Sequence, residues 1–373
     1  MKQISWWNRK IGIEEITEIV SAVENKNIGM GKITELLEQE ISEILNVPYV
    51  VVTNSGSSAL FISLSVLGIG FGDEVIIPDR TFIATAHAVQ LTGAKVILTD
   101  VNKNNTNIDV TQIEKKISSK TKAIIPVHLN GRAVQMDEIN EIAQRYNLKV
   151  IEDSCQSFMS KNSNNQFLGT MSDLGCFSMG LTKLITTVYG GFIVCHKKKV
   201  YKKLIRYRNH GIYNPNELSY NTLGFNFKVS DMMMSMGRTQ LINYKATIKH
   251  CKKIYNLYAK TIESLDFIDL IAVDLKYEIP LYIEVFSSNK IEVVKYLEKK
   301  GISINHMTPS LHLSKHLDQE KFDFDNSINF NKYGFSLPCG PDQKIKDIKY
   351  VLSKLIEYNE KENNENIINR TNI

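Results

Sequence analysis

Short apolar strands alternate with helices from about residue 48 to residue 210, and this alternation limits the possible folds more than any other feature. Each strand is only a few residues long and almost wholly apolar, as expected of strands that are buried on both faces. Such alternation indicates βαβ units and a parallel sheet covered by helices on both sides. We therefore predict one doubly wound α/β domain here. The expected strands are residues 49–53, 74–77, 95–100, 121–130, 149–154 and 190–195, and the expected helices begin at Ser57 or span residues 82–91, 109–118 and 136–147.

The stretch from residue 149 to residue 183 carries several reactive side chains that follow these strands. The strand KVI delivers Glu152 and Asp153 at its carboxyl end, and Gln156 follows three residues later. A second apolar run, LGCF, ends on Ser178, and Lys183 lies five residues beyond it. Ligands of open α/β sheets bind beyond the carboxyl ends of the strands. This set suits pyridoxal 5′-phosphate (PLP), which needs an amine for a Schiff base and a carboxylate for its pyridinium nitrogen.

A possible anion site lies earlier, where Gly56 turns the chain between a strand and an apolar helix that starts with Ser57 and Ser58. The first N–H groups of a helix lack intrahelical partners, so a helix start aims them, with the two hydroxyls, at an anion. The alternative is that the serines only cap the helix. Each of these features alone has such a structural explanation, and their combination in one chain favours a cofactor site.

Composition narrows the function classes. The net charge of +5 is mild, and the lysines are dispersed along the chain. This charge favours small anionic substrates. It does not support nucleic-acid binding, because the sequence has no recognisable motif for reading nucleic acid. No apolar run approaches 18 residues and the start of the sequence lacks an apolar h-region, so we expect neither a membrane span nor a secretory signal. Five cysteines without a CxxC pair indicate a reduced, cytoplasmic protein with no metal site.

The C-terminal half predicts a second, smaller α/β domain. A helix of about residues 230–265 leads to a strand in YEIPLYIEVF, a helix in NKIEVVKYLEKKG and a last helix in IKDIKYVLSKLIEY. We expect a large domain of residues 1–245, of which those before about residue 30 could pack on the small domain. The small domain should span residues 246–360, and the Asn-rich residues 361–373 should form a disordered tail.

Seven stretches follow one another along the chain: NSGSSAL, GDEVIIPDRTFIATAHAV, KAIIPVHLNG, KVIEDSCQ, GCFSMGLTK, RNHG and GFNFKVSD. With these stretches, from about residue 10 to residue 355, the chain resembles the DegT–DnrJ family of PLP-dependent sugar aminotransferases. This resemblance implies the fold-type-I aminotransferase architecture, with a large, mostly parallel sheet domain and a smaller C-terminal α/β domain. It also implies PLP as cofactor, with PMP formed during turnover.

The resemblance assigns roles to residues of this chain. Lys183 would form the Schiff base and shuttle the proton, and Asp153 would pair with the pyridinium nitrogen. The other implied cofactor contacts are Gln156 near the phenolic oxygen, Phe82 on the pyridine face, Ser57, Ser58 and Ser178 at the phosphate, and Asn226 at the phosphate of the neighbouring subunit. The last contact implies a homodimer with shared active sites.

The implied reaction moves an amino group from L-glutamate to a keto-sugar nucleotide, mostly an NDP-4-keto-6-deoxyhexose, for surface-glycan synthesis such as O-antigen or capsule. Another PLP reaction on the same scaffold is the alternative: amination of a 3-keto sugar or inosose, aminohydroxybenzoate formation, or deoxysugar dehydration. A third possibility is a non-catalytic relative. The dehydrating branch lacks the lysine, so Lys183 favours transamination, and a non-catalytic relative should have lost Lys183 or Asp153.

Several positions depart from the family pattern and concern substrate identity. Leu184 replaces the usual Asn after the lysine, Tyr189 stands where an acidic or amide residue is usual, and Lys228 stands where Arg is common. Five further side chains could contact a base or sugar, although ordinary packing is the simpler explanation for each: Trp6, Trp7, Tyr213, Tyr220 and His306.

Overall fold

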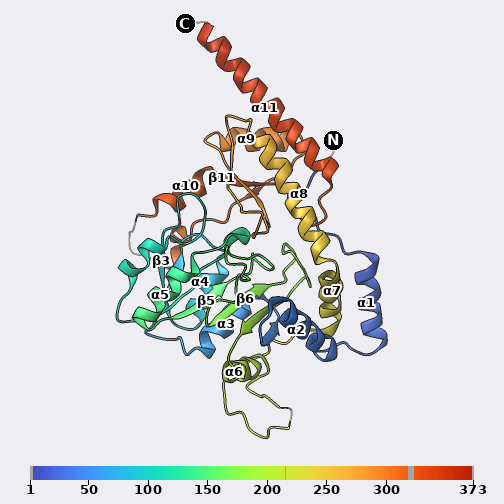
Figure 1. The fold of residues 1–373 in the computed structure, drawn as a ribbon, viewed down its shortest axis with the longest axis vertical. Helices are drawn as coiled ribbons and strands as arrows, with labels where there is room; N and C mark the ends of the chain where they lie inside the picture. The colour runs from blue at the N-terminus through green and yellow to red at the C-terminus, as the bar shows by residue number, and fades with distance from the viewer. Residues whose placement is uncertain (1–2, 215, 318–322, 372–373) are drawn as a thin grey trace.

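The computed structural model describes residues 3–214, 216–317 and 323–371 and contains two sheets. The larger sheet has seven strands in the order β1-β7-β6-β5-β4-β2-β3. Only β7 runs antiparallel to its neighbours, so the sheet is mostly parallel, as the sequence predicts (Figure 1). Its strands are β1 (Tyr49–Thr53), β2 (Glu74–Pro78), β3 (Lys95–Thr99), β4 (Thr121–Ile124), β5 (Lys149–Asp153), β6 (Leu174–Ser178) and β7 (Gly191–Cys195).

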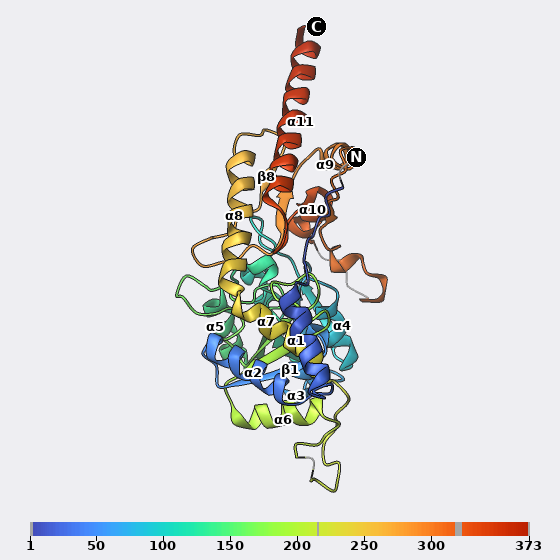
Figure 2. The ribbon, with the colours of Figure 1, turned by 90° about the vertical axis from the view of Figure 1, so that its right-hand side faces the viewer.

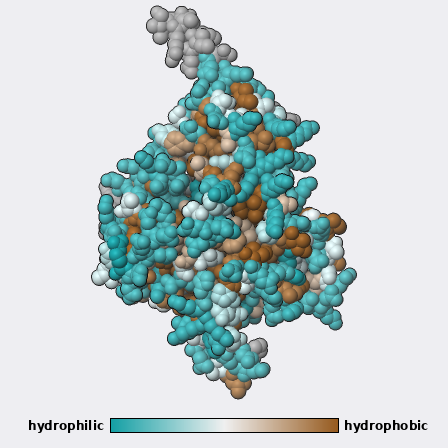
Figure 3. Space-filling model, viewed as in Figure 1, coloured by the Kyte–Doolittle hydropathy of each residue, from teal (hydrophilic) through white to brown (hydrophobic). Residues whose placement is uncertain are grey.

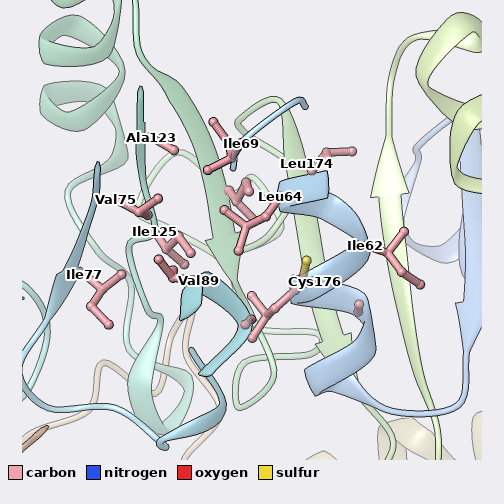
Figure 4. Close-up of a cluster of buried hydrophobic side chains, with 14 of the residues drawn as sticks. Ile62, Leu64, Ile69, Val75, Ile77, Val89, Ala123, Ile125, Leu174 and Cys176 are labelled. Atoms are coloured by element: carbon pink, nitrogen blue, oxygen red, sulfur yellow. The ribbon is translucent and has the colours of Figure 1, made fainter. Parts of the chain in front are cut away.

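The helix α3 (Gly56–Val66) is the centre of the main hydrophobic core. It is apolar on nearly all sides, which is typical of a helix buried between other layers. Leu64 of α3 and Val89 of α4 (Ala84–Leu91) lie in one cluster with Val75 of β2 and with Ile125, which directly follows β4 (Figure 4). This packing fixes the start of α3, and therefore the candidate anion site, against the sheet.

Further helices surround the large sheet, and one connection differs from the sequence prediction. These helices are α1 (Ile13–Glu24), α2 (Lys32–Leu45), α5 (Met136–Tyr146) and α6 (Lys198–Arg208). The helix predicted over residues 109–118 is wrong, because this stretch forms two 3₁₀ turns, η1 (Val110–Gln112) and η2 (Glu114–Lys116). Asp109 accepts a hydrogen bond from the Thr111 N–H (3.1 Å), a local bond that competes with helix formation.

The smaller sheet has the strand order β10-β11-β9-β8 and lies above the large sheet with α8, α9 and α11 (Figure 1, Figure 2). Its strands are β8 (Asp269–Leu270), β9 (Ile283–Phe286), β10 (Asn305–His306) and β11 (Gly334–Leu337). The helices and 3₁₀ turns of this half are α7 (Asp231–Ile242), α8 (Tyr244–Ile262), α9 (Lys290–Lys299), η4 (Leu311–Leu313), η5 (Lys315–Leu317), α10 (Asp325–Tyr333) and α11 (Ile345–Thr371), and η3 (Leu129–Gly131) follows β4.

Two helices of this half differ from the sequence prediction. The single helix expected over residues 230–265 is divided at Asn243, whose backbone (φ −101°, ψ 8°) is not helical, so α7 and α8 form separate helices. The tail expected from Lys361 continues α11 as far as Thr371. The sequence KENNENIINRT contains neither Gly nor Pro, so no residue in it stops a helix.

The N-terminal segment, residues 4–8, runs along the small sheet's side of the molecule. Ile4 pairs with Ile302 and Trp7 pairs with Cys339, both in parallel orientation. The Cys339 N–H donates to the Trp6 carbonyl (2.8 Å), and the Asn8 N–H donates to the Cys339 carbonyl (3.1 Å). A Cβ at Gly340, which has φ +122°, would lie 2.6 Å from the Asn8 carbonyl oxygen, so this approach requires glycine.

Asp231 connects the two helical layers by capping α2 from the start of α7. Its carboxylate is buried and accepts hydrogen bonds from the N–H groups of Gly31, Ile33 and Thr34 (3.0 Å each) and from the Thr34 hydroxyl (2.5 Å). These are the N–H groups that a helix start leaves without partners. The carboxylate also lies at the positive end of the α2 dipole.

Replacing Asp231 with alanine is expected to destabilise the protein by about 3 kcal/mol, because it leaves several buried donors of α2 unpaired. The midpoint of urea denaturation measures this loss. Asp231→Asn keeps one carbonyl oxygen and should lose about half as much. An unchanged midpoint for Asp231→Ala would show that water satisfies these donors equally well.

Candidate active site

A cavity of about 560 Å³ opens beyond the carboxyl ends of the parallel strands, where an α/β sheet binds its ligands. Six of the eight side chains predicted as cofactor contacts line it: Ser57, Phe82, Asp153, Gln156, Ser178 and Lys183. They come from α3, from the segment before α4, from the ends of β5 and β6, and from the loop after β6. Residues far apart in the sequence therefore meet in one cavity.

Asp153 lies at the end of β5 and is almost fully buried. Its Oδ2 accepts a hydrogen bond from the Thr85 hydroxyl (2.8 Å), and its Oδ1 accepts one from the Cys155 N–H (3.1 Å). The Thr81 hydroxyl supports Thr85 at 2.8 Å. These contacts fix the orientation of the carboxylate. Thr85 was not among the predicted site residues, although its position three residues after Phe82 in a helical pattern places the two on one face.

The serines at the start of α3 have different roles, since some hold the turn and one lines the cavity. Ser55 caps the helix by accepting the Ser58 N–H (3.0 Å), and the Ser58 hydroxyl donates to Asn54 (2.6 Å). Ser57 lines the cavity, whereas Ser58 is not among its lining residues. The N–H groups of Gly56 and Ser57 lie in the first turn, where no earlier helical carbonyl can pair with them. This arrangement presents backbone donors and the positive end of a helix dipole to an anion.

Gly56 allows α3 to approach the ends of β6 and β7 closely. A Cβ at Gly56 would lie 2.7 Å from the Cys155 sulfur and 2.9 Å from the Ser178 Cβ. A Cβ at Gly191, the first residue of β7, would lie 2.5 Å from the Gly56 nitrogen. Since real Cβ contacts are not this short, the two glycines allow the backbone contact that forms this end of the cavity.

Lys183 lies in the loop between β6 and β7, on a turn in which its N–H donates to the Gly180 carbonyl (3.0 Å). The Gly180 N–H in turn donates to the Ser178 hydroxyl (3.2 Å). Burial and the Asp153 carboxylate raise the pKa of the neighbouring Cys155 thiol, while the Lys183 ammonium opposes this shift. The thiol therefore stays neutral between these influences, and Lys183 and Asp153 both line the same cavity.

Gln156 connects the cavity to the small sheet. Its side-chain oxygen accepts the Asn130 N–H (3.0 Å), and the Asn130 amide donates to the Tyr282 carbonyl (2.9 Å) and to Glu284 (3.0 Å). Arg132 pairs with Glu284 at 2.7 Å. This network joins the loop after β4 to β9, so both halves of the molecule form one cavity.

The wall contributed by the small sheet was largely missed by the sequence analysis, because no local motif marks it. It consists of Tyr282, Glu284, Asn305, Met307, Thr308, Pro309 and Ser336. Trp6 and His306, two of the five side chains that could contact a base or sugar, also line it. Trp7 does not line the cavity but packs edge-on against Tyr282. Tyr213 and Tyr220 line a separate hollow beside Lys228.

Asn226 lies outside the cavity of its own chain. It is exposed and pairs with Asn209 in the long loop between α6 and α7, which projects beyond α6 (Figure 1). Thus neither Asn226 nor Ser58 is brought together with the other predicted site residues.

In the part of the chain that the structure describes, every helix is too short or too polar to span a membrane.

The donor set fits PLP, because an amine, a buried and oriented carboxylate, an aromatic side chain and a helix start converge on one cavity. Comparison with known proteins agrees. Residues 9–356 match the model of the DegT/DnrJ/EryC1/StrS aminotransferase family. The UDP-4-amino-4,6-dideoxy-N-acetyl-beta-L-altrosamine transaminase of Campylobacter jejuni subsp. jejuni serotype O:23/36 (strain 81-176) is 31% identical over 96% of this chain and 98% of its own length.

Two further comparisons concern a different amination position and the fold. A UDP-N-acetyl-3-dehydro-alpha-D-glucosamine 3-aminotransferase of Acidithiobacillus ferrooxidans is 34% identical over 68% of each chain. The structure of Spr1654 from Streptococcus pneumoniae in its PMP form has a TM-score of 0.90 at 24% identity, covering 96% of this chain and 98% of that one. The chain therefore belongs to the DegT/DnrJ/EryC1/StrS aminotransferase family and is a sugar aminotransferase with PLP as its cofactor.

Proposed function

We propose that this protein transfers an amino group from L-glutamate to C4 of an NDP-4-keto-6-deoxyhexose, in two half-reactions on PLP and PMP, for surface-glycan synthesis. The convergence of Lys183, Asp153 and the start of α3 on one cavity carries the proposal. The name of the Campylobacter relative, a 4-amino-4,6-dideoxy sugar on UDP, supports amination at C4. A cytoplasmic location fits five cysteines that are all free thiols.

The proposed division of labour follows from where each side chain lies. PLP supplies an electron sink that stabilises negative charge on the carbon attached to the transferred nitrogen. Lys183 would hold the cofactor covalently and carry the proton between carbon atoms. Asp153, held by Thr85 and the Cys155 N–H, would keep the pyridine nitrogen protonated. Phe82, a residue that is 56% exposed and lines the cavity, would stack on the cofactor ring.

The proposed phosphate site consists of Ser57, Ser178 and the N–H groups at the start of α3. Ser58 acts on it indirectly, since its bonds to Ser55 and Asn54 hold that turn. Gln156, fixed by the Asn130 N–H, is placed to hydrogen-bond near the phenolic oxygen. The phosphate, the ring and the reactive carbon of the cofactor would thus each have a separate partner in the chain.

We further propose a homodimer in which Asn226 completes the phosphate site of the neighbouring subunit. Asn226 is exposed and lies outside its own cavity, in a loop that also exposes Leu223 (75%) and Phe225 (67%). On α1, four exposed side chains form one apolar face at helical spacing: Ile13, Ile16, Val20 and Val23. Apolar residues gather in this region of the surface (Figure 3). Burial between two subunits would remove this apolar surface from water.

Adding L-glutamate to the purified PLP enzyme is expected to replace the visible band of the lysine-bound cofactor with the shorter-wavelength band of PMP. The absorbance spectrum measures this first half-reaction directly. D-glutamate serves as the matched control and should leave the spectrum unchanged. If L-glutamate has no effect while the visible band is present, a different amino donor or a different PLP reaction replaces the proposal.

The PMP form then identifies the acceptor, because recovery of the visible band reports the second half-reaction. The Acidithiobacillus relative acts on a 3-dehydro sugar and favours amination at C3 as the second candidate. Matched UDP-linked 4-keto-6-deoxy and 3-keto sugars separate the two. Recovery with the 3-keto sugar alone would overturn amination at C4 and leave the sugar aminotransferase assignment intact.

A further inference from the structure

The cavity has an aromatic wall that the cofactor roles do not use. Trp6 and Tyr282 both line the cavity, with ring centroids 6.1 Å apart. Trp7 packs behind them, 5.9 Å from Trp6 and 5.5 Å from Tyr282. Phe82, the aromatic residue assigned to the cofactor, belongs to the segment before α4 in the other half of the molecule. The wall and the residue assigned to the cofactor ring therefore come from different halves of the molecule.

A chain of contacts links this wall to the reacting amine. The Tyr282 hydroxyl lies 3.3 Å from the Thr182 hydroxyl and 3.4 Å from the Thr182 carbonyl oxygen, and Thr182 directly precedes Lys183. The Tyr282 carbonyl accepts the Asn130 amide, whose backbone N–H bonds to Gln156. Trp6 therefore packs beside a residue whose hydroxyl contacts the lysine loop and whose carbonyl is bonded to Asn130, the partner of Gln156.

The position of Trp6 is fixed by backbone bonds on both sides. The Ile4 N–H donates to Gly301 (2.8 Å), and the Ser303 N–H donates to the Ile4 carbonyl (2.9 Å). Beyond Trp6, Asn8 pairs with Cys339 and packs against Gly340, where no Cβ would fit. The Ile4 side chain is 2% exposed and belongs to the core of the small sheet. The backbone at Trp6 is therefore fixed before any substrate arrives, and the Trp7 and Tyr282 rings pack beside the indole, which lowers the entropy cost of binding.

We propose that Trp6, backed by Tyr282, is a specificity-determining residue that packs on the apolar face of the sugar ring of the acceptor. This proposal rests on the proposed function, which supplies a sugar nucleotide as acceptor. The ring of a deoxyhexose has C–H groups on one face, and a large aromatic ring gives them apolar contact while the sugar's polar groups stay free. L-glutamate has no such ring, so the two half-reactions should depend on Trp6 differently.

The kinetic test measures the two half-reactions separately in the PLP enzyme. Trp6→Ala should raise the KM for the keto-sugar nucleotide at least about tenfold, or about 1.4 kcal/mol, and leave the rate of PMP formation from L-glutamate within about twofold. Trp6→Phe keeps a ring and should lose less. Ser5→Ala, an exposed neighbour on the same segment, is the matched control. An unchanged KM, or a parallel loss in both half-reactions, overturns the proposal in favour of a structural role.

A binding test does not depend on turnover. The chain has two tryptophans, so Trp7→Phe leaves Trp6 as the sole indole fluorophore. In this variant the holoenzyme's fluorescence should change when UDP-N-acetylglucosamine binds and should not respond to UDP alone. An equal response to UDP would place the indole at the nucleotide, and no response to either would remove it from the acceptor site. If the fluorescence responds to the sugar nucleotide but the enzyme aminates no sugar, Trp6 still contacts the sugar and the proposed function is rejected.

Discussion

Replacing Lys183 with alanine is expected to abolish multiple turnover, with a loss of at least about 10⁴-fold, because the chain then lacks both its covalent link to the cofactor and its proton carrier. The visible band of the lysine-bound cofactor should disappear as well. Lys183 is only half-buried and lies in a loop, so the fold should persist, and the thermal unfolding midpoint should stay near that of the unmodified protein. Normal multiple-turnover activity in this variant would eliminate the assignment.

The same variant tests the shared site. Lys183→Ala and Asn226→Ala are each expected to be impaired alone, yet a mixture that exchanges subunits should regain activity. In a mixed dimer, one of the two sites combines Lys183 from one subunit with Asn226 from the other. Without recovery after subunit exchange, Asn226 does not act across the interface.

Asp153→Asn is expected to lower kcat about 100-fold or more, which corresponds to about 2.7 kcal/mol of transition-state stabilisation. An amide cannot keep the pyridine nitrogen protonated, so the cofactor becomes a weaker electron sink. The structure accommodates the amide, because its oxygen can accept the Cys155 N–H and its NH₂ can donate to the Thr85 hydroxyl. The variant should therefore still bind PLP, which its absorbance spectrum reports.

Thr85→Val provides the matched control, since it removes one contact of the carboxylate and keeps its charge. Its kcat should fall much less than that of Asp153→Asn. If the two variants lose the same activity, the orientation of the carboxylate limits the rate more than its charge. If Asp153→Asn has an unchanged kcat, the pyridinium partner is another residue.

The sequence predicts the large sheet well because each strand carries its own signal. Strands such as β6 and β7 are short and almost wholly apolar, which is typical of strands covered on both faces. The same logic locates Asp153 and Ser178 at the cavity, since they follow strands whose carboxyl ends meet at one edge. Ser58 shows the limit: adjacent serines at a helix start look alike in sequence, and only the turn geometry decides which of them faces the cavity.

Features that depend on contacts between distant segments could not be predicted. The break at Asn243 lies in a run with helical periodicity on both sides, and no Gly or Pro marks it. Tyr282 and Glu284 join the cavity because Asn130 and Arg132 hold them there, across about 150 residues of sequence. Trp6 reaches it because the N-terminal segment returns to the small sheet. None of these residues belongs to a local motif, so the pattern along the chain carries no signal for them.

The mode of attachment of residues 4–8 has a consequence for how such enzymes diverge. The segment is held by main-chain bonds on both sides of Trp6, by the buried Ile4 side chain and by the close approach at Gly340, so an exchange of the Trp6 side chain leaves that attachment in place. Mutations at position 6 could therefore accumulate at little expense to folding while the chemistry at Lys183 stays intact. Transplanting this short segment between relatives offers a compact way to retune acceptor choice by design.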